Sequence, residues 1–196
     1  SRYSGQLDIS VGSTIANRPH PQLEKLIGVF LNTIVLRSDL SGDPTVMELL
    51  KRVRTTALEA YQYQNVPFEQ VDALNPARDM SHSRLFQVMF ILQNTPGAAA
   101  DAMTTPSGLS IRQIELERGV SPFDITLSMD TVDGQLVGKW EYNRDLFNES
   151  TIQQMTTHFQ QLLESMVSAP QQSISKLSML TSAERSHLLP SKQDRS

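Results

Sequence analysis

Histidine is the side chain most often used as a general base near neutral pH, so the histidines are the first candidates for chemistry. The chain has four of them: His20, His82, His158 and His187. No two are closer than 29 positions, and none falls in the His-x-x-x-His spacing of a helical metal site. His158 precedes an apolar position of a predicted helix, which favours a structural role at the helix flank. His20 lies in a proline-flanked loop.

Other catalytic signatures are missing from the sequence. It contains no Gly-x-Ser-x-Gly elbow, no Gly-x-Gly-x-x-Gly loop and no Gly-Lys-Ser/Thr ending. Residues 148–150 match a glycosylation acceptor, but we interpret Ser150 as the cap of the helix that follows. Asp130 and Asp133 flank a predicted hairpin turn, where aspartate is common. The residues alone therefore predict neither a catalytic group nor a metal site.

Composition excludes several classes of function. The 196 residues include 17 basic and 21 acidic side chains and no cysteine. Disulfides and thiolate chemistry are excluded, and the charge balance argues against a nucleic-acid partner. No apolar run reaches the ~18 residues of a membrane span, and no signal peptide is recognisable, so we expect a cytoplasmic protein without a membrane partner. A strand is predicted close to Ser1, which suggests a fragment of a longer chain.

The elements that must position any functional residue follow from hydrophobic periodicity. Strands are predicted at residues 7–11, 26–37, 85–93 and 110–117, and helices at residues 45–64, 67–74, 151–167 and about 182–189. Residues 12–25, 94–108 and 190–196 are expected to be irregular. The run at 26–37 is almost continuously apolar and is predicted to be buried. We expect an α/β layered sandwich, with a mixed β-sheet flanked by helices.

Two local patterns are especially clear. Residues 123–142 alternate apolar and polar side chains around Asp133-Gly134, which predicts a β-hairpin with one buried face. The helix at 45–64 has two possible N-terminal caps: Asp43 with Pro44 at the first helical position, or a capping box of Thr45 with Glu48. A second capping box, Thr181 with Glu184, predicts the last helix.

Several segments together resemble the condensation-domain family of nonribosomal peptide synthetases, in particular its C-terminal half. Residues 27–33 (IGVFLNT) with Arg37 resemble the family's I-G-x-F-x-N-T…R motif, and residues 64–69 (QNVPFE) resemble Q-D-V-P-F-E. Residues 78–81 (RDMS) and 85–90 (LFQVMF) resemble the family's R-D-x-S…P-L-F-Q-V-M-F segment. Residues 8–12 with Arg18 resemble the loop that precedes the I-G-x-F-x-N-T…R motif. Residues 121–124 (SPFD) also fit. The tail at 177–185 is similar to the linker toward an adenylation domain.

The sequence departs from the family pattern in three places. Asn65 stands where the family usually has aspartate, and residues 82–84 lack the usual proline before the leucine. The family's catalytic H-H-x-x-x-D-G motif is missing, because no two histidines are adjacent. By resemblance, the second histidine of that motif assists attack of the acceptor amine on a donor thioester. We therefore expect no catalytic residue in this chain, and no activity from it alone.

The resemblance implies a chloramphenicol acetyltransferase-like fold whose two halves enclose a substrate tunnel. Residues 1–176 would form the C-terminal subdomain and one tunnel wall, and 177–196 would lead to a downstream adenylation domain. The implied partners are the N-terminal half of the domain, that adenylation domain, and donor and acceptor carrier proteins. The carrier proteins, and not this chain, would hold 4'-phosphopantetheine. The residues expected to line the tunnel are Gly12, Arg18, Asn32, Arg37, Ser121 and Asp124.

Structural roles remain open for these residues: Arg37 and Asp124 could pair with each other, and Asn32 could satisfy backbone groups. Three functional hypotheses also remain. The first is part of a condensation domain that forms amide bonds. The second is a module that only docks carrier proteins or an adenylation domain. The third, a free-standing acyltransferase of the same fold, is disfavoured by the adenylation-type tail.

Overall fold

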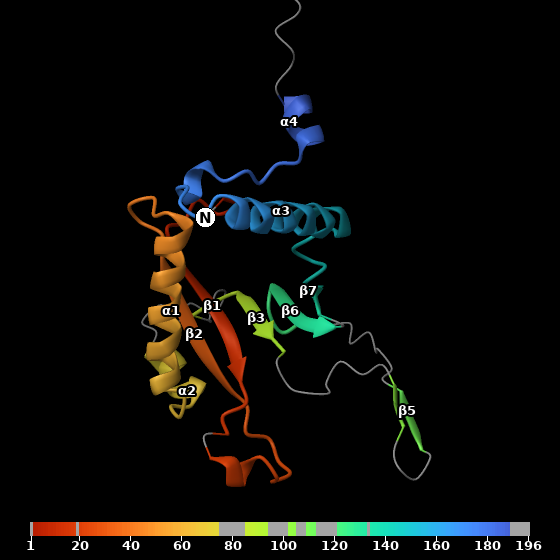
Figure 1. The fold of residues 1–196 in the computed structure, drawn as a ribbon. Coiled ribbons are helices and arrows are strands. Elements are labelled where there is room, and N and C mark those ends of the chain that lie inside the picture. The colour runs from red at the N-terminus through yellow and green to blue at the C-terminus, as the bar shows by residue number, and fades with distance from the viewer. Residues whose placement is uncertain are drawn as a thin grey trace, which may run out of the picture. The chain divides into compact units, whose positions relative to one another are not determined.

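The computed structural model describes residues 2–18, 20–74, 85–93, 102–104, 109–112, 121–132 and 134–188. Several predictions fall outside these residues. They concern the motif at 78–81, His82, Asp133, the tail at 190–196, most of the loop at 94–108 and the strand residues 113–117. The described part contains a mixed sheet, a small antiparallel strand pair and a set of helices (Figure 1).

The main sheet has five strands in the order β2-β1-β3-β6-β7. The strands are β1 (Asp8–Ile15), β2 (Asn32–Asp39), β3 (Val88–Leu92), β6 (Ile125–Val132) and β7 (Gln135–Tyr142). β3 pairs parallel with both β1 and β6, whereas β6 and β7 pair antiparallel. The predicted mixed sheet is therefore confirmed. A separate antiparallel pair is formed by β4 (Ala102–Thr104) and β5 (Ser110–Arg112).

The helices agree closely with the predicted spans. They are α1 (Val46–Gln62), α2 (Phe68–Ala73), α3 (Glu149–Ser168) and α4 (Ser182–Leu188), with 3₁₀ turns η1 (Pro21–Leu23) and η2 (Ile174–Lys176). Both capping boxes form: Thr45 N–H donates to Glu48 at 2.8 Å, and Thr181 N–H donates to Glu184 at 2.8 Å. The alternative cap at Asp43 is not used for α1, because the Asp43 carboxylate accepts from Ser175 instead.

Three local predictions were wrong. β1 extends to Ile15, so the first residues of the predicted loop at 12–25 are strand. β2 begins at Asn32, and residues 26–31 are not strand. α3 begins at Glu149 after Asn148, so Ser150 lies inside the helix and does not cap it. The predicted hairpin is confirmed over residues 125–142, with Leu127 opposite Trp140 and Gly134 at φ 76° in the turn. The face predicted to be buried is only partly buried, because Leu127 is 6% exposed but Leu136 is 66% exposed.

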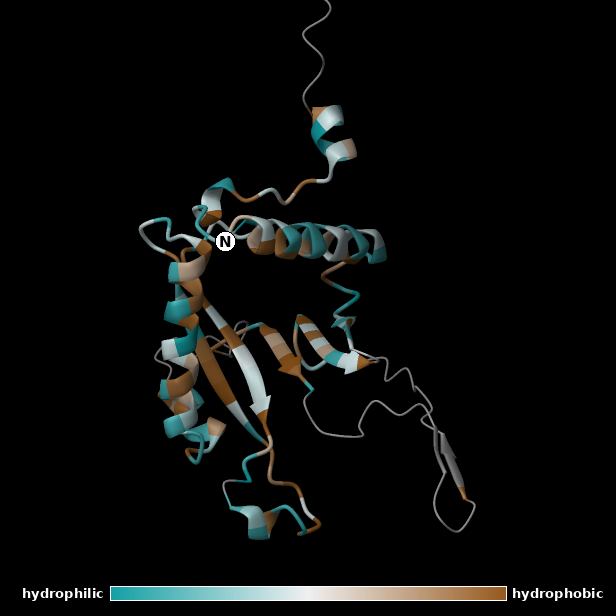
Figure 2. Cartoon of the chain, viewed as in Figure 1, coloured by the Kyte–Doolittle hydropathy of each residue, from teal (hydrophilic) through white to brown (hydrophobic). Residues whose placement is uncertain are grey.

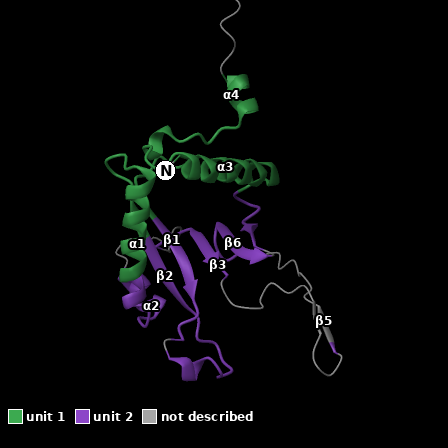
Figure 3. Ribbon diagram, in the orientation of Figure 1, with its two compact units in different colours: residues 1–9, 37–59, 147–196 green, residues 10–36, 60–146 purple. Residues whose placement is uncertain are grey.

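The chain divides into two compact units, shown in different colours in Figure 3. Unit 1 comprises residues 1–9, 37–59 and 147–196, and unit 2 comprises residues 10–36 and 60–146. The buried apolar side chains of unit 1 are Leu40, Val46, Ile152 and Leu177, and those of unit 2 are Ile34, Phe86, Met89, Ile125 and Leu127. Each unit thus has an apolar core of its own.

Candidate functional site

Phe86 is a fully buried side chain of unit 2, and several predicted tunnel residues lie near it. Its ring is 1% exposed and packs against the rings of Phe68 and Phe123, with centroids 5.6 and 5.4 Å away. Gly12 lies in β1 against the same ring, because a Cβ at this position would come 2.1 Å from Phe86 Cε2. A glycine inside a strand often marks such a close approach. Gly12 is therefore required by packing, and the sequence analysis missed Phe86 as its partner.

Asn32 joins two of the family-like motifs through backbone contacts. Its side-chain amide donates to the carbonyl oxygens of Gln64 at 2.7 Å and Val66 at 2.8 Å. Its Oδ1 accepts from the N–H of Thr33 at 2.9 Å and of Phe68 at 3.2 Å, at the start of α2. All the polar atoms of the Asn32 amide group are thus used to fix the turn at 64–68. The structural interpretation of Asn32 as a residue that satisfies backbone groups is confirmed.

Ser121 and Asp124 lie at the entrance to β6. The Ser121 hydroxyl donates to the carbonyl oxygen of Phe123 at 2.6 Å, which fixes the turn before the strand. The backbone N–H of Asp124 donates to the carbonyl of Gln87 at 3.1 Å, and its carbonyl accepts from Asn143 at 3.0 Å. The segment at 121–124 is therefore attached to the strands on either side of β6, next to the Phe86 cluster.

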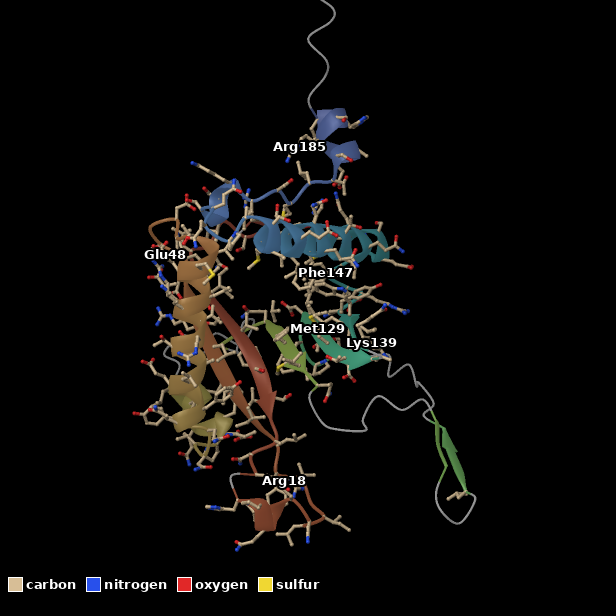
Figure 4. The ribbon with its side chains drawn as sticks, viewed as in Figure 1. Arg18, Glu48, Met129, Lys139, Phe147 and Arg185 are labelled. Atoms are coloured by element: carbon tan, nitrogen blue, oxygen red, sulfur yellow. The ribbon has the colours of Figure 1, made fainter. Side chains whose placement is uncertain are left out.

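Arg18 follows β1, where Asn17 takes a left-handed conformation at φ 49°. Asparagine tolerates this conformation better than most residues. The Arg18 guanidinium donates to the carbonyl oxygens of Leu23, Leu26 and Gly28, and it lies 4.3 Å from the centre of the Phe30 ring. The Arg18 side chain is labelled in Figure 4. Charge-assisted hydrogen bonds and a cation–π contact both stabilise this loop.

Arg37 belongs to unit 1 and pairs with Asp8, not with Asp124 as one prediction had it. Its Nε and Nη2 atoms bind the Asp8 carboxylate at 2.5 to 3.1 Å. The guanidinium lowers the pKa of Asp8, and the carboxylate in turn raises the pKa of Arg37. Arg37 also lines a shallow pocket in unit 1 with Asp39, Lys51, Arg52, Thr55 and Thr56. Because both side chains of the ion pair are more than half exposed, water screens it.

His158 is buried, although the sequence placed it only at a helix flank. Its side chain is 5% exposed; Nδ1 lies 2.5 Å from the Tyr3 hydroxyl and Nε2 lies 3.0 Å from Glu184. Hydrogen bonds from Thr181, with a further one from His158, lower the pKa of Glu184 to about 2. Burial raises the pKa of Tyr3, with a smaller contribution from the Glu184 charge. These contacts tie α4 to α3 and to the start of the chain.

The described ranges contain no group of three or more His, Cys, Asp or Glu side chains that could hold a metal ion. Among the helices described, none is long and apolar enough to cross a membrane. What the candidate residues share is a positioning role: Gly12, Asn32, Ser121 and Asp124 converge on the aromatic cluster of Phe68, Phe86 and Phe123. Arg18 orders a loop of the same unit.

Comparison with known proteins identifies the family. The family model described as the condensation domain matches residues 1–189. The chain belongs to the condensation-domain family. It is 47% identical over 191 residues to a component of the linear gramicidin synthase of Brevibacillus parabrevis, covering 96% of this chain and 4% of that protein. It is also 42% identical over 190 residues to malpinin synthetase of Mortierella alpina, covering 96% and 2%. The chain thus spans only a small part of these relatives, and its resemblance to condensation domains of nonribosomal peptide synthetases is confirmed.

Solved structures of related proteins show the same fold. A four-domain nonribosomal peptide synthetase bound to AMP and glycine superposes with a TM-score of 0.81 at 25% identity, covering 93% of this chain and 15% of that one. The X-domain from teicoplanin biosynthesis gives a TM-score of 0.78 at 28% identity, covering 91% and 41%. That X-domain has also been solved in complex with OxyB. The chain therefore has the predicted chloramphenicol acetyltransferase-like fold of condensation domains.

Proposed function

We propose that this chain is the C-terminal subdomain of a condensation domain that forms amide bonds between carrier-bound substrates. The main support is the family match over residues 1–189, together with relatives that are peptide synthases. The chain also spans only 41% of the teicoplanin X-domain structure, which leaves room for a further subdomain. In this proposal residues 1–176 form one wall of the substrate tunnel, and residues 177–196 lead toward an adenylation domain.

In the proposed reaction, the acceptor amine attacks the carbonyl carbon of the donor thioester. The new C–N bond forms as the C–S bond breaks, the donor carrier's phosphopantetheine thiol leaves, and the amine gives up a proton. The base, by resemblance, is the second histidine of H-H-x-x-x-D-G, in the subdomain that this chain does not contain. Holding two tethered substrates together lowers such a barrier by up to ~7–11 kcal/mol.

The residues of this chain would contribute position and shape. Asn32 fixes the turn at 64–68, and Phe86 holds α2, β1 and the entrance of β6 around one ring. Gly12, Arg18, Asn32, Arg37, Ser121 and Asp124 remain our candidates for the tunnel wall. The proposed partners are the N-terminal subdomain, the two carrier proteins with their 4'-phosphopantetheine arms, and the adenylation domain.

The proposal is tested by reconstitution. The subdomain that carries H-H-x-x-x-D-G is supplied together with donor and acceptor carrier proteins loaded with aminoacyl groups. Intact-protein mass spectrometry then measures the dipeptidyl thioester on the acceptor carrier. We expect product only when both subdomains are present. A reaction in which the second histidine of the motif is replaced by alanine is the matched control, and product without this chain would contradict the proposal.

A docking module without catalysis is the second candidate. The likeness to the teicoplanin X-domain favours it, because that domain has been solved in complex with another protein, OxyB. In the same experiment, carrier-protein binding without dipeptidyl product would support this candidate over the first.

A further inference from the structure

Helix α4 has no buried residue of its own, although it belongs to unit 1. Leu188 is 64% exposed, and Figure 2 shows hydrophilic and hydrophobic residues mixed along this short helix. Glu184 is its half-buried position. One carboxylate oxygen of Glu184 closes the capping box with Thr181, and the other receives hydrogen bonds from α3. The position of α4 on α3 therefore depends on the Glu184 carboxylate.

The hydrogen bonds from α3 to Glu184 come from His158 and Gln154. The His158 Nε2 atom lies 3.0 Å from Glu184 Oε1, and the Gln154 amide nitrogen lies 3.3 Å from the same oxygen. Because the pKa of Glu184 is about 2, its carboxylate is ionised near neutral pH, and an ionised carboxylate only accepts hydrogen bonds. His158 Nε2 must therefore carry the proton of its contact with Glu184.

The other imidazole nitrogen of His158 faces the start of the chain. Nδ1 lies 2.5 Å from the Tyr3 hydroxyl, and the two rings are tilted by 33° with their centroids 6.0 Å apart. A neutral imidazole has one donor and one acceptor nitrogen, so a proton on Nε2 leaves Nδ1 to accept from the Tyr3 O–H. Burial raises the pKa of Tyr3, which keeps the proton on its hydroxyl. The contacts with Tyr3 and with Glu184 thus require the same tautomer of His158.

Tyr3 and His158 differ sharply in exposure. Tyr3 is 58% exposed, whereas His158 is 4% exposed. The Tyr3 hydroxyl therefore reaches a buried ring from the surface of the unit. Without this hydroxyl, Nδ1 is a buried polar atom that has lost its partner, which is unfavourable. The imidazole can respond by moving its proton or by rotating, and both responses weaken its hydrogen bond to Glu184.

We propose that Tyr3, His158 and Glu184 form a hydrogen-bond relay in which the Tyr3 hydroxyl selects the Nε2–H tautomer of His158 and thereby holds α4 on α3. His158 is the positioning residue, and it couples Tyr3 at one end of the chain to α4 at the other. All three residues belong to unit 1, so the coupling does not depend on which reaction the condensation domain catalyses. Displacement of Tyr3 loosens α4, and by reciprocity the release of α4 weakens the hold on Tyr3.

The tautomer is tested by nitrogen NMR of the chain with isotopically labelled histidine. His158→Gln identifies the His158 signals among those of the four histidines. Near neutral pH we expect a neutral His158 with its proton on Nε2. Tyr3→Phe keeps the aromatic ring and removes the hydroxyl, so it should turn this single state into a mixture. Tyr63→Phe removes a hydroxyl from a tyrosine that is 70% exposed and is the matched control, which should leave the His158 signals unchanged.

The hold on α4 is tested by amide hydrogen exchange in residues 181–188. Tyr3→Phe should speed this exchange by about tenfold, the effect expected from the loss of one hydrogen bond, and Tyr63→Phe should not. His158→Gln separates the two contacts, because its side-chain amide can donate to Glu184 without needing Tyr3 to fix a tautomer. In the His158→Gln background, Tyr3→Phe should therefore cause no further change in exchange.

Each result supports or overturns the relay. A neutral Nε2–H state that becomes mixed in Tyr3→Phe, together with faster exchange in α4, would support it. An imidazolium or an Nδ1–H tautomer in the unsubstituted chain would overturn it, and this measurement needs no variant that might misfold. Unchanged exchange in α4 of Tyr3→Phe would overturn the coupling. Equal effects of Tyr3→Phe with and without His158 would overturn the role of the imidazole. Circular dichroism and exchange in α1 show whether each variant is folded.

Discussion

The segment at 174–184 in unit 1 and the segment at 23–31 in unit 2 are held in the same way. Arg2 donates to the carbonyl oxygens of Ile174, Ser175 and Leu177, as Arg18 donates to three carbonyls of its own loop. The two segments differ in what happens to their apolar side chains. Leu177 is 4% exposed, whereas Ile27 is fully exposed. An arginine fork can therefore fix the backbone of a segment whether the apolar side chains of that segment are buried or exposed.

The largest expected effect comes from truncating an apolar side chain in each segment. Leu177→Ala should cost about 2–5 kcal/mol of unfolding free energy, because it removes buried methyl groups and leaves a cavity. Ile27→Ala should change it by less than ~0.5 kcal/mol, since the side chain is already in water. Urea denaturation followed by circular dichroism measures both. Similar losses from the two variants would contradict the comparison.

The segment at 174–184 is held by His158 as well as by Arg2, because His158 hydrogen-bonds Glu184. His158→Ala should cost about 1–3 kcal/mol, because it removes a buried side chain that hydrogen-bonds the Tyr3 hydroxyl on one side and Glu184 on the other. Urea denaturation measures this cost, and hydrogen exchange in α4 shows whether that helix is released. His187→Ala, at an exposed position of α4, is the matched control and should behave like the unsubstituted chain.

The hydrogen bonds of the Glu184 carboxylate should weaken in acid, whereas the contacts of the Arg18 guanidinium with backbone carbonyls should not. The pKa of Glu184 is about 2 in the folded chain, below the ordinary value of 4.5. The ionised carboxylate therefore stabilises the fold above pH 4.5, and this contribution is lost as the pH falls from 4.5 toward 2. NMR shifts of the Thr181 amide between about pH 6 and 2 follow the change. A midpoint at the ordinary glutamate pKa would contradict it, and Glu184→Gln should remove the transition.

Substitution of Arg37 should change the stability of the fold least. Its guanidinium binds a carboxylate on an exposed surface, whereas Arg2 and Arg18 bind backbone carbonyls. Its fork binds the Asp8 carboxylate, yet its side chain is 74% exposed. Arg37→Gln should leave the urea midpoint unchanged within error, because exposed ion pairs contribute little. A clear fall in the urea midpoint would contradict this expectation, because it would show that the exposed Arg37–Asp8 ion pair stabilises the fold substantially. Lys51→Gln, on helix α1, is the matched charge control.

Sequence patterns predicted the elements that local chemistry determines. The capping boxes at Thr45 and Thr181 indicated the correct helix starts, and alternation with Gly134 indicated the hairpin. Residues 26–31 were misassigned because an apolar run was taken to indicate a buried strand, whereas Ile27 and Val29 are exposed in an irregular segment. At α3 the chain enters the helix at Glu149, earlier than a cap at Ser150 would allow.

The candidate site was predictable in its residues but not in their contacts. The Asn32 hydrogen bonds join positions more than 30 residues apart, and the closeness of Gly12 to Phe86 depends on the parallel pairing of β1 with β3. The Tyr3 hydroxyl that contacts His158 Nδ1 at 2.5 Å comes from 155 positions away. Such long-range contacts arise from the fold, so no local pattern around any one of these residues indicates them.

Unit 1 is assembled from three separate stretches, residues 1–9, 37–59 and 147–196. During translation the first of them leaves the ribosome well before the last, by roughly 7–30 s at about 5–20 residues per second. Tyr3 can contact His158 only after α3 has been synthesised, and Arg2 can bind the Ile174 carbonyl only after η2 has been synthesised. For that interval residues 1–9 have no native contact with these elements. The order of synthesis therefore limits how early unit 1 can complete its fold.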